Sequence, residues 1–364
     1  MTPPHSLHYT RAVRTVVGRK WAEGLFLCIF LAASAGAASA GTTTVASGSA
    51  PVIIAQMRAG TLTVRTWNRP QVQIATDGSV TARNIAPQQV ARRIPKQIPL
   101  GTPQLLTPRG PIGLPPEPFV VPRLAPGPHA GVVLRGSGNT VVTIPATSAL
   151  LIAHLMRGSM TISGYRGGVF LAVVRVGNVR LLNVAGTGAV QVLSGRIIAL
   201  HSDFTRLQAR TARGNLLFRN CTATQIEATS VLGSIAYDNG TFRPGLARFQ
   251  SERGNVALGL ASGGLQIGAH SNSGQIYSAL PSSATVRRSA NTAQATVGGG
   301  GPVVTANSGT GSVFLYQGAL RSHPQLRQRL QKLRAQQQRS IIRRPPPVRR
   351  APPRFAHHPP IRKL

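Results

Sequence analysis

Four carboxylic acids in the central part of the chain are the first candidates for chemistry. Glycoside hydrolysis generally uses two carboxyl groups about 5–10 Å apart, one of them as a proton donor. Counted from the preceding glycine of the periodic series described below, the acids fall at offsets of 8, 13, 5 and 19 residues. No two share an offset, so stacked repeats would not bring two of them together, which argues against an acid-pair glycosidase. The four are Asp203, Glu227, Asp238 and Glu252.

Arginine or lysine can act as the base of a polysaccharide lyase, so the basic residues need the same test. Arg157, Arg213 and Arg253 each stand one residue before a periodic glycine. The repeats between them carry Val176, Ser194 and Leu232 at that position. Such a broken row is typical of surface turns. A lyase-type β-helix enzyme stays open as an alternative, and incubation with acidic polysaccharides, followed by detection of unsaturated products, would test it.

Ligands for a metal or cofactor are sparse. His201 and His270 are isolated, and the adjacent pair His357 and His358 lies near the C-terminus. Cys221 has no CxxC partner, and neither a Walker loop nor an Asp-rich calcium repeat occurs. The sequence therefore predicts no catalytic residues, no metal site and no cofactor. Cys221 is expected to be buried in a turn or in the core.

The elements that must position these residues are marked by glycine. Seven anchor glycines follow one another at steps of 19, 18, 19, 19, 21 and 20 residues. Each is followed by a polar and then an apolar residue, the alternation of a strand with one buried face. A glycine-marked period near twenty is typical of stacked β-strand coils. The anchors are Gly158, Gly177, Gly195, Gly214, Gly233, Gly254 and Gly274.

A second apolar segment lies between successive anchors, so each coil is expected to hold two strands. We predict an all-β, single-domain β-solenoid, a stack like a parallel β-helix of two-strand coils of about 19 residues, with disordered termini. Asn178, Asn215 and Asn255 recur directly after anchors, where their amides are expected to bond along the stack. Gly60–Ile74 is expected to cap the start of the stack, and a final copy begins at Gly311.

Composition sets the remaining boundaries. Residues 41–51 read as a spacer, and 52–80 as the first strands of the repeat domain. Proline-rich residues 81–131 are predicted to be an insertion or linker, because proline blocks helix and central strand alike. Residues 132–318 form the predicted repeat domain, and residues 319–364 a basic, disordered tail with a short amphipathic helix.

The N-terminus, residues 1–40, resembles an export signal. Four basic residues precede an apolar stretch, and Ala38-Ser39-Ala40 supplies small residues before a cleavage position. The apolar run is too short for a good membrane span, so no transmembrane segment is expected after cleavage; an uncleaved anchor is the alternative. The mature protein is expected in the periplasm or at the cell surface.

The charge is strongly positive, with 41 Lys and Arg against seven Asp and Glu. Removing residues 1–40 takes away four of the basic and one of the acidic residues, which leaves about +31. Such a chain attracts polyanions: lipopolysaccharide, acidic glycans or anionic lipid. The alternative is adaptation to an acidic medium. Phe355 is the single aromatic residue of the basic tail, so specific nucleic-acid binding is not expected.

The tail is predicted to carry the polyanion binding, through a basic helix and the proline-rich segment after it. Thirteen Lys and Arg and no acid stand between residues 321 and 364. The tail residues proposed for binding are Arg327, Arg329, Lys332, Arg334, Arg343, Arg344, Arg349, Arg350, Arg354, Arg362 and Lys363.

Three segments resemble the bacterial putative-adhesin family, a secreted β-strand-repeat domain of unknown function. They are the Gly60–Ile74 region with its Trp67-Asn68 turn, Val142–Pro145, and units such as Arg213–Leu216. The resemblance implies a repeat β-fold at the bacterial cell envelope and no catalytic residues. The expected role is that of a non-catalytic, adhesin-like structural or binding protein. A scaffold or sensor that binds an unknown protein partner is the other alternative.

Overall fold

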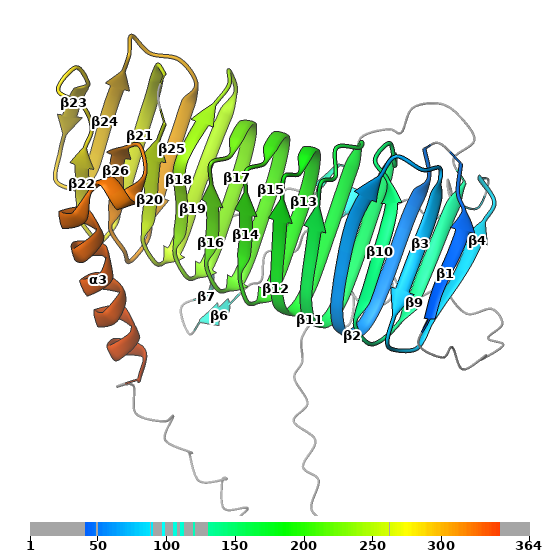
Figure 1. The fold of residues 1–364 in the computed structure, drawn as a ribbon. Coiled ribbons are helices and arrows are strands. Elements are labelled where there is room, and N and C mark those ends of the chain that lie inside the picture. Colours follow the sequence, from blue (N-terminus) through cyan, green and yellow to red (C-terminus); the bar gives the residue numbers. More distant parts are fainter. Residues whose placement is uncertain are drawn as a thin grey trace, which may run out of the picture. The chain divides into compact units, whose positions relative to one another are not determined.

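The structure is a computed structural model and describes residues 41–342, apart from positions 49 and 262 and several stretches between 88 and 129. The export signal and the tail beyond Ile342 lie outside the described residues. The expected all-β class is confirmed, because strands make up most of the described chain and one α-helix follows them (Figure 1). The chain forms two compact units, and the boundary between them falls after Arg196.

Unit 1 is a stack of mainly parallel strands, with antiparallel strands at one end. Its strands are β1 (Gly41–Ala46), β2 (Val52–Trp67), β3 (Gln71–Thr76), β4 (Val80–Ile85), β9 (Gly131–Gly136), β10 (Thr140–Pro145), β11 (Leu150–Ser163), β12 (Val169–Leu182) and β13 (Ala185–Ser194). In β11 and β12 the chain runs on as one long strand through Gly158 and Gly177, which are paired in register. Each long strand bends at its anchor glycine, where φ is positive.

The order of the strands in unit 1 differs from their order in the chain. β2 pairs in parallel with β11 on one side and with β9 and β10 on the other (Figure 1). The expected cap at Gly60–Ile74 is therefore wrong in its first part, since Gly60–Trp67 lies inside the stack. The outermost rung comes from β9 and β10, and the antiparallel strands β1, β3 and β4 close that end.

The proline-rich segment begins later than expected, because β4 still pairs with β9. Within the segment, β5 (Gln97–Ile98) pairs with β8 (Phe119–Val120), and β6 (Leu105–Thr107) pairs with β7 (Gly110–Ile112), both antiparallel. The rest of the predicted insertion lies largely outside the described residues.

Unit 2 contains the remaining coils. Its elements are β14 (Ile197–Leu200), β15 (Asp203–Arg213), β16 (Leu216–Arg219), β17 (Thr222–Leu232), β18 (Ile235–Phe242), β19 (Leu246–Arg253), β20 (Val256–Leu260), β21 (Leu265–Ser271), β22 (Ile276–Ala279), β23 (Thr285–Arg288), β24 (Thr292–Val297), β25 (Val303–Ser308), β26 (Val313–Gln317), η1 (Leu320–Ser322) and α3 (Pro324–Ile342).

The C-terminal end of unit 2 is also built out of chain order. β25 pairs with both β19 and β21, and β26 pairs with both β20 and β22. The predicted final repeat, which begins at Gly311 and contains β26, therefore lies between the repeat of Gly254 and the repeat of Gly274. It does not end the stack. β24 pairs antiparallel with β21, and β23 pairs antiparallel with β24; these two strands end the stack.

Stacked aromatic and aliphatic side chains fill the interior. The apolar residue two positions after each anchor is buried, except Ile276, which is half-buried. In unit 2 the Tyr237 ring lies 4.6 Å from that of Phe242 and 5.3 Å from that of Phe249, centroid to centroid. Packing of like side chains at equal heights supplies the apolar burial that holds neighbouring coils together.

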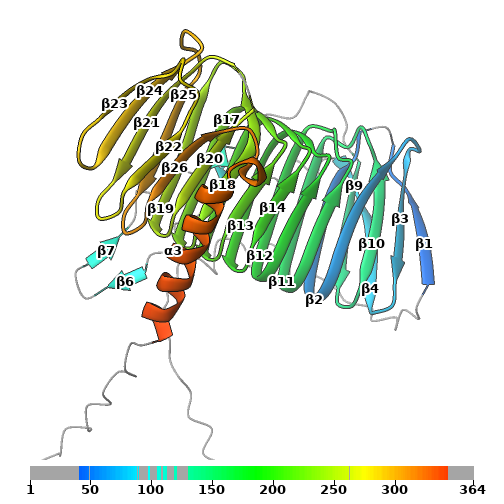
Figure 2. The same ribbon diagram turned by 60° about the vertical axis from the view of Figure 1, so that its left-hand side comes forward.

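Helix α3 is a packed part of unit 2. It lies against the sheet beside β20 and β26 (Figure 2). There Leu330, which is 2% exposed, packs with Phe314, Tyr316 and Ala257. Arg329 lies 4.6 Å above the Tyr277 ring of β22. The tail thus differs from the expectation: its basic helix runs to Ile342 and covers an apolar sheet face instead of remaining free in solution.

Candidate functional site

The anchor glycines form the corner at which each coil bends, called here the glycine corner. A Cβ built on Gly177 would lie closer than 3.0 Å to the carbonyl oxygen of Gly158 in the adjacent coil. The same conflict recurs at Gly158, Gly195, Gly233, Gly254 and Gly274. Glycine is required there because the neighbouring backbone occupies the space of a side chain. These residues shape the stack.

A row of hydroxyl groups, missed in the sequence, supports the glycine corner in unit 2. Each serine stands three residues before a glycine and donates to the carbonyl oxygen of the glycine in the adjacent coil, over 2.7–2.9 Å. The donors are Ser230, Ser251, Ser308 and Ser271. In unit 1 the same position holds buried Leu155, Val174 and Val192. The shared offset of the serines was the signal that could have revealed them.

A second corner, which the sequence analysis did not predict, lies six residues after an anchor glycine. Its residue adopts a left-handed backbone with φ of 51–53°, which asparagine tolerates better than most residues. These residues recur at steps of 18 or 19 and are Asn183, His201, Asn220 and Asn239. His201, an isolated histidine in the sequence, therefore occupies one of these left-handed corner positions.

The amide ladder differs from the prediction. Oδ1 of Asn215 accepts from the backbone N–H of Ser234 (2.7 Å), and Oδ1 of Asn255 accepts from that of Ser312 (2.8 Å). These asparagines therefore bond along the stack through the backbone, because the next coil has serine at the matching position. A side-chain amide bond occurs at the left-handed corner, where Asn239 Nδ2 donates to Asn220 Oδ1 (2.8 Å).

Three of the four candidate carboxylates are occupied by arginine. Asp203 pairs with Arg243, Glu227 with Arg210, and Asp238 with Arg219, at N–O distances of 2.8, 2.6 and 3.2 Å. The fourth, Glu252, is half-buried, and burial raises its pKa while nearby Arg253 acts in the opposite direction. Arginine-paired carboxylates at separate places offer charge neutralisation and structural anchoring.

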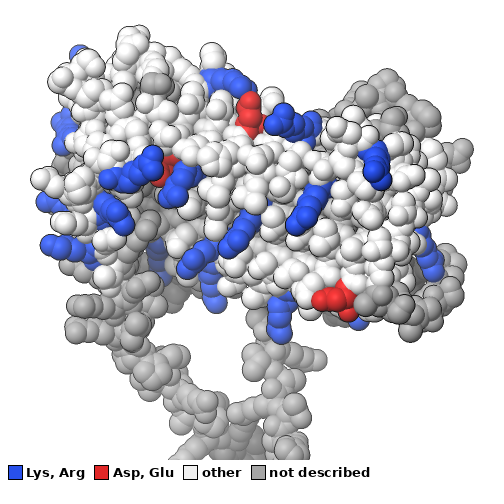
Figure 3. Space-filling model, viewed as in Figure 1, with Lys and Arg blue, Asp and Glu red and all other residues white. Residues whose placement is uncertain are grey.

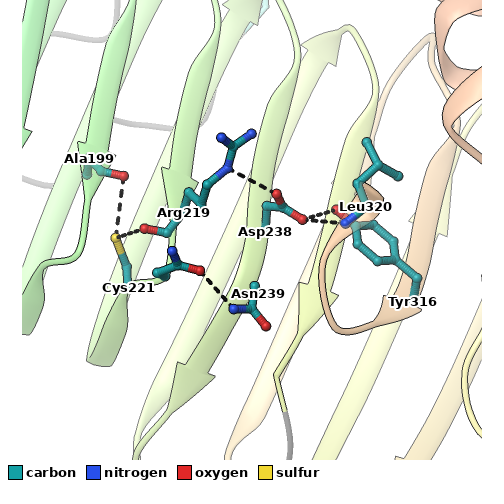
Figure 4. Close-up of polar contacts among 8 residues, drawn as sticks. Ala199, Arg219, Cys221, Asp238, Asn239, Tyr316 and Leu320 are labelled. Carbon is teal, nitrogen blue, oxygen red and sulfur yellow. Dashed lines mark hydrogen bonds and ion pairs between the residues drawn. The ribbon is translucent and has the colours of Figure 1, made fainter. Parts of the chain in front are cut away.

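The most extensively bonded carboxylate is Asp238, at the junction of three chain segments (Figure 4). Oδ2 accepts from Arg219 Nε of the neighbouring strand. Oδ1 accepts from the backbone N–H of Leu320 (2.7 Å) and from the Tyr316 hydroxyl (3.3 Å). Asp238 therefore ties the turn before helix α3 to the sheet.

Cys221 is buried, as expected, and its Sγ donates to the carbonyl oxygens of Ala199 (3.5 Å) and Arg219 (3.4 Å) (Figure 4). Burial raises the pKa of the thiol to about 11. At pH 8 only about one thiol in a thousand would be ionised, and the thiolate is the reactive form.

We therefore expect Cys221 to react with a maleimide at pH 8 at least about a hundredfold more slowly in the native protein than in urea. Mass spectrometry of the peptide that contains Cys221, sampled over time, measures both rates. Equal rates in the two conditions would contradict the burial of this thiol.

Basic side chains are spread over the surface instead of forming one pocket, and Figure 3 shows many of them with few acidic neighbours. Arg157, Arg213 and Arg253 are exposed at the glycine corner. Of the predicted tail residues, Arg327, Arg329 and Lys332 are exposed on α3, and Arg334 lies on the same helix. The others, from Arg343 to Lys363, lie outside the described residues.

Among the described residues, no three His, Cys, Asp or Glu side chains gather closely enough to hold a metal ion. The helix that the structure describes is not apolar enough to cross a membrane.

No family model and no curated protein matches the chain. Among solved structures, the chain is similar to a protein from Clostridium sporogenes described as a "putative cell adhesion protein". The identity is 7% and the TM-score 0.25, over 76% of this chain and 99% of that chain. Similarity at this level does not assign the chain to a family.

Proposed function

We propose that the protein is an exported, non-catalytic, adhesin-like protein whose basic surface binds anionic polymers of the bacterial cell envelope. The observation that carries this proposal is the surplus of arginine over carboxylate on a scaffold of stacked strands. The described residues of unit 1 include ten arginines and one acid, Asp77. Asp77 bonds to the backbone N–H and the side chain of Asn139, at 2.7 and 2.8 Å.

The scaffold suits a binding role. We infer that the stack is a β-solenoid, on the basis of parallel pairs in register about 19 residues apart, such as Gly158 with Gly177. A stack of this kind presents repeated positions at a spacing of about 4.8 Å. Guanidinium groups held on such a frame can contact several phosphate, sulfate or carboxylate groups of one extended polymer.

Binding of this kind depends on salt, because each contact releases counterions from the polymer. The tail beyond α3 adds seven basic residues and no acid. The helix itself belongs to unit 2, so the tail is best tested by a truncation that begins after Ile342.

Deleting residues 343–364 is expected to weaken heparin binding about tenfold at 0.15 M salt, because clustered basic charge is lost while the fold is retained. Heparin affinity at several salt concentrations measures the change, with circular dichroism as the check on folding. Unchanged affinity and an unchanged salt slope would contradict a role for the tail. Failure of the full chain to bind heparin, lipopolysaccharide or acidic glycan would contradict the proposed function itself.

A further inference from the structure

The glycine corner of unit 1 carries exposed apolar side chains between its arginines. Directly before the corner, two successive residues of each coil point outward, while the residue before them is buried, as Leu155 and Val174 are. These two positions hold Arg58-Ala59 in β2, Met156-Arg157 in β11, Arg175-Val176 in β12 and Leu193-Ser194 in β13; all are exposed except Ser194, which is half-buried.

Register places these residues in a checkerboard. Arg157 pairs with Ala59 on one side and with Val176 on the other, and Val176 pairs with Ser194. Each arginine on one coil thus stands beside an apolar residue on the next, over four coils or about 14 Å. We call this surface the amphipathic corner; it comprises Arg58, Met156, Arg157, Arg175, Val176 and Leu193.

The apolar members are unusually open to solvent. Met156 is 37%, Val176 44% and Leu193 43% exposed, and together they are three of the five large apolar residues exposed among the described residues. At the position of Met156 and Leu193, two residues before the anchor glycine, unit 2 has buried Ala212 and Val231. Exposed apolar side chains gathered on one surface commonly mark a contact with a partner.

The excess of positive charge in unit 1 indicates an anionic partner. Asp77 is the one carboxylate among the described residues of unit 1, and its bonds go to Asn139. An anionic lipid surface supplies both phosphate for guanidinium groups and an apolar boundary for Met, Val and Leu side chains. A soluble polyanion would use the arginines alone and leave the apolar members in water.

We propose that the amphipathic corner docks unit 1 onto an anionic lipid bilayer, with the arginines at the headgroup phosphates and the apolar side chains at the acyl boundary. This inference deepens the proposed function and rests on it, since it names the envelope component that one surface contacts.

A positional probe tests the docking in the full chain. Cys28 is first replaced by Ser, so that Cys221 is the one native cysteine left. An environment-sensitive fluorophore is then attached at Met156→Cys or, as a matched control, at Leu246→Cys; Leu246 lies in unit 2 and is 44% exposed. Buried Cys221 is protected from the label. With phosphatidylglycerol vesicles we expect a blue shift and stronger emission at position 156 but not at position 246, and no change at either with phosphatidylcholine.

Two further variants separate lipid from polymer. Replacing Arg58, Arg157 and Arg175 by Gln should weaken vesicle binding at least about tenfold, more than the charge-matched replacement of exposed Arg213, Arg248 and Arg253. Changing Met156, Val176 and Leu193 to Ser should weaken vesicle binding and leave heparin binding unchanged. Circular dichroism and the urea midpoint confirm that each variant is folded.

The proposal is overturned if the probe responds equally at both positions or at neither, or if the serine variant binds vesicles like the wild type. Each of these outcomes can occur while the full chain still binds heparin, and that binding would still support the proposed polymer binding. Failure of the full chain to bind heparin would instead contradict the proposed function.

Discussion

Replacing Gly177 by alanine is expected to lower the free energy of unfolding of unit 1 by about 3–5 kcal/mol. The added methyl group would occupy the position of the Gly158 carbonyl oxygen, and the φ of 140° at Gly177 disfavours any side chain. Relief requires the two coils to separate, which breaks hydrogen bonds and apolar contacts along β11 and β12. The urea unfolding midpoint of the purified variant measures the loss.

Gly268→Ala is the matched control, since a Cβ on Gly268 would meet no atom within 4 Å and its backbone is not left-handed. We expect that control to be neutral or slightly stabilising, because alanine restricts the unfolded chain. Wild-type stability of Gly177→Ala would show that the coils do not approach each other as closely as the structure has them.

Asp238→Ala is expected to destabilise the attachment of the C-terminal segment by about 2–4 kcal/mol. The substitution removes the acceptor of the Leu320 N–H and the Tyr316 hydroxyl and leaves Arg219 without its carboxylate. Hydrogen exchange along α3 measures the effect, since release of the turn should expose the helix amides much faster than those of the central strands.

Asp203→Ala serves as the control, because the ion pair of Asp203 with Arg243 is half-exposed and screened by water. That variant should show little change in helix exchange or in the urea midpoint. If Asp238→Ala exchanges like the wild type while remaining folded, the anchoring role of Asp238 is wrong, and the packing of Leu330 and the Arg329–Tyr277 contact hold the helix.

Local pattern was sufficient for the fold class and the burial of the core. Alternation after each anchor gave the buried residues, because a strand with one buried face must place apolar side chains at every second position. Local pattern predicts the tail helix only in part. The spacing of Leu326, Leu330 and Leu333 gives an apolar stripe, but no local feature indicates the sheet face of Phe314 and Tyr316 that it covers.

The candidate surface was harder to recognise from the sequence. Arg157, Arg213 and Arg253 share an offset, and Val176, Ser194 and Leu232 interrupt that row. Only the structure shows that Val176 remains exposed beside Arg157, whereas Leu232, at the matching position of unit 2, is half-buried. Exposure at a corner depends on how the backbone bends there, and that bend is set by the neighbouring coil.

The sequence by itself determined the period, the inward and outward alternation and the strand class, since each depends on residues close together in the chain. The tertiary structure alone decided the order of the rungs, with β2 placed between β10 and β11 and β25 between β19 and β21. Every coil offers much the same backbone donors, acceptors and apolar side chains to its neighbour. Local pattern therefore fits any order, and the choice rests on contacts between residues far apart in the chain.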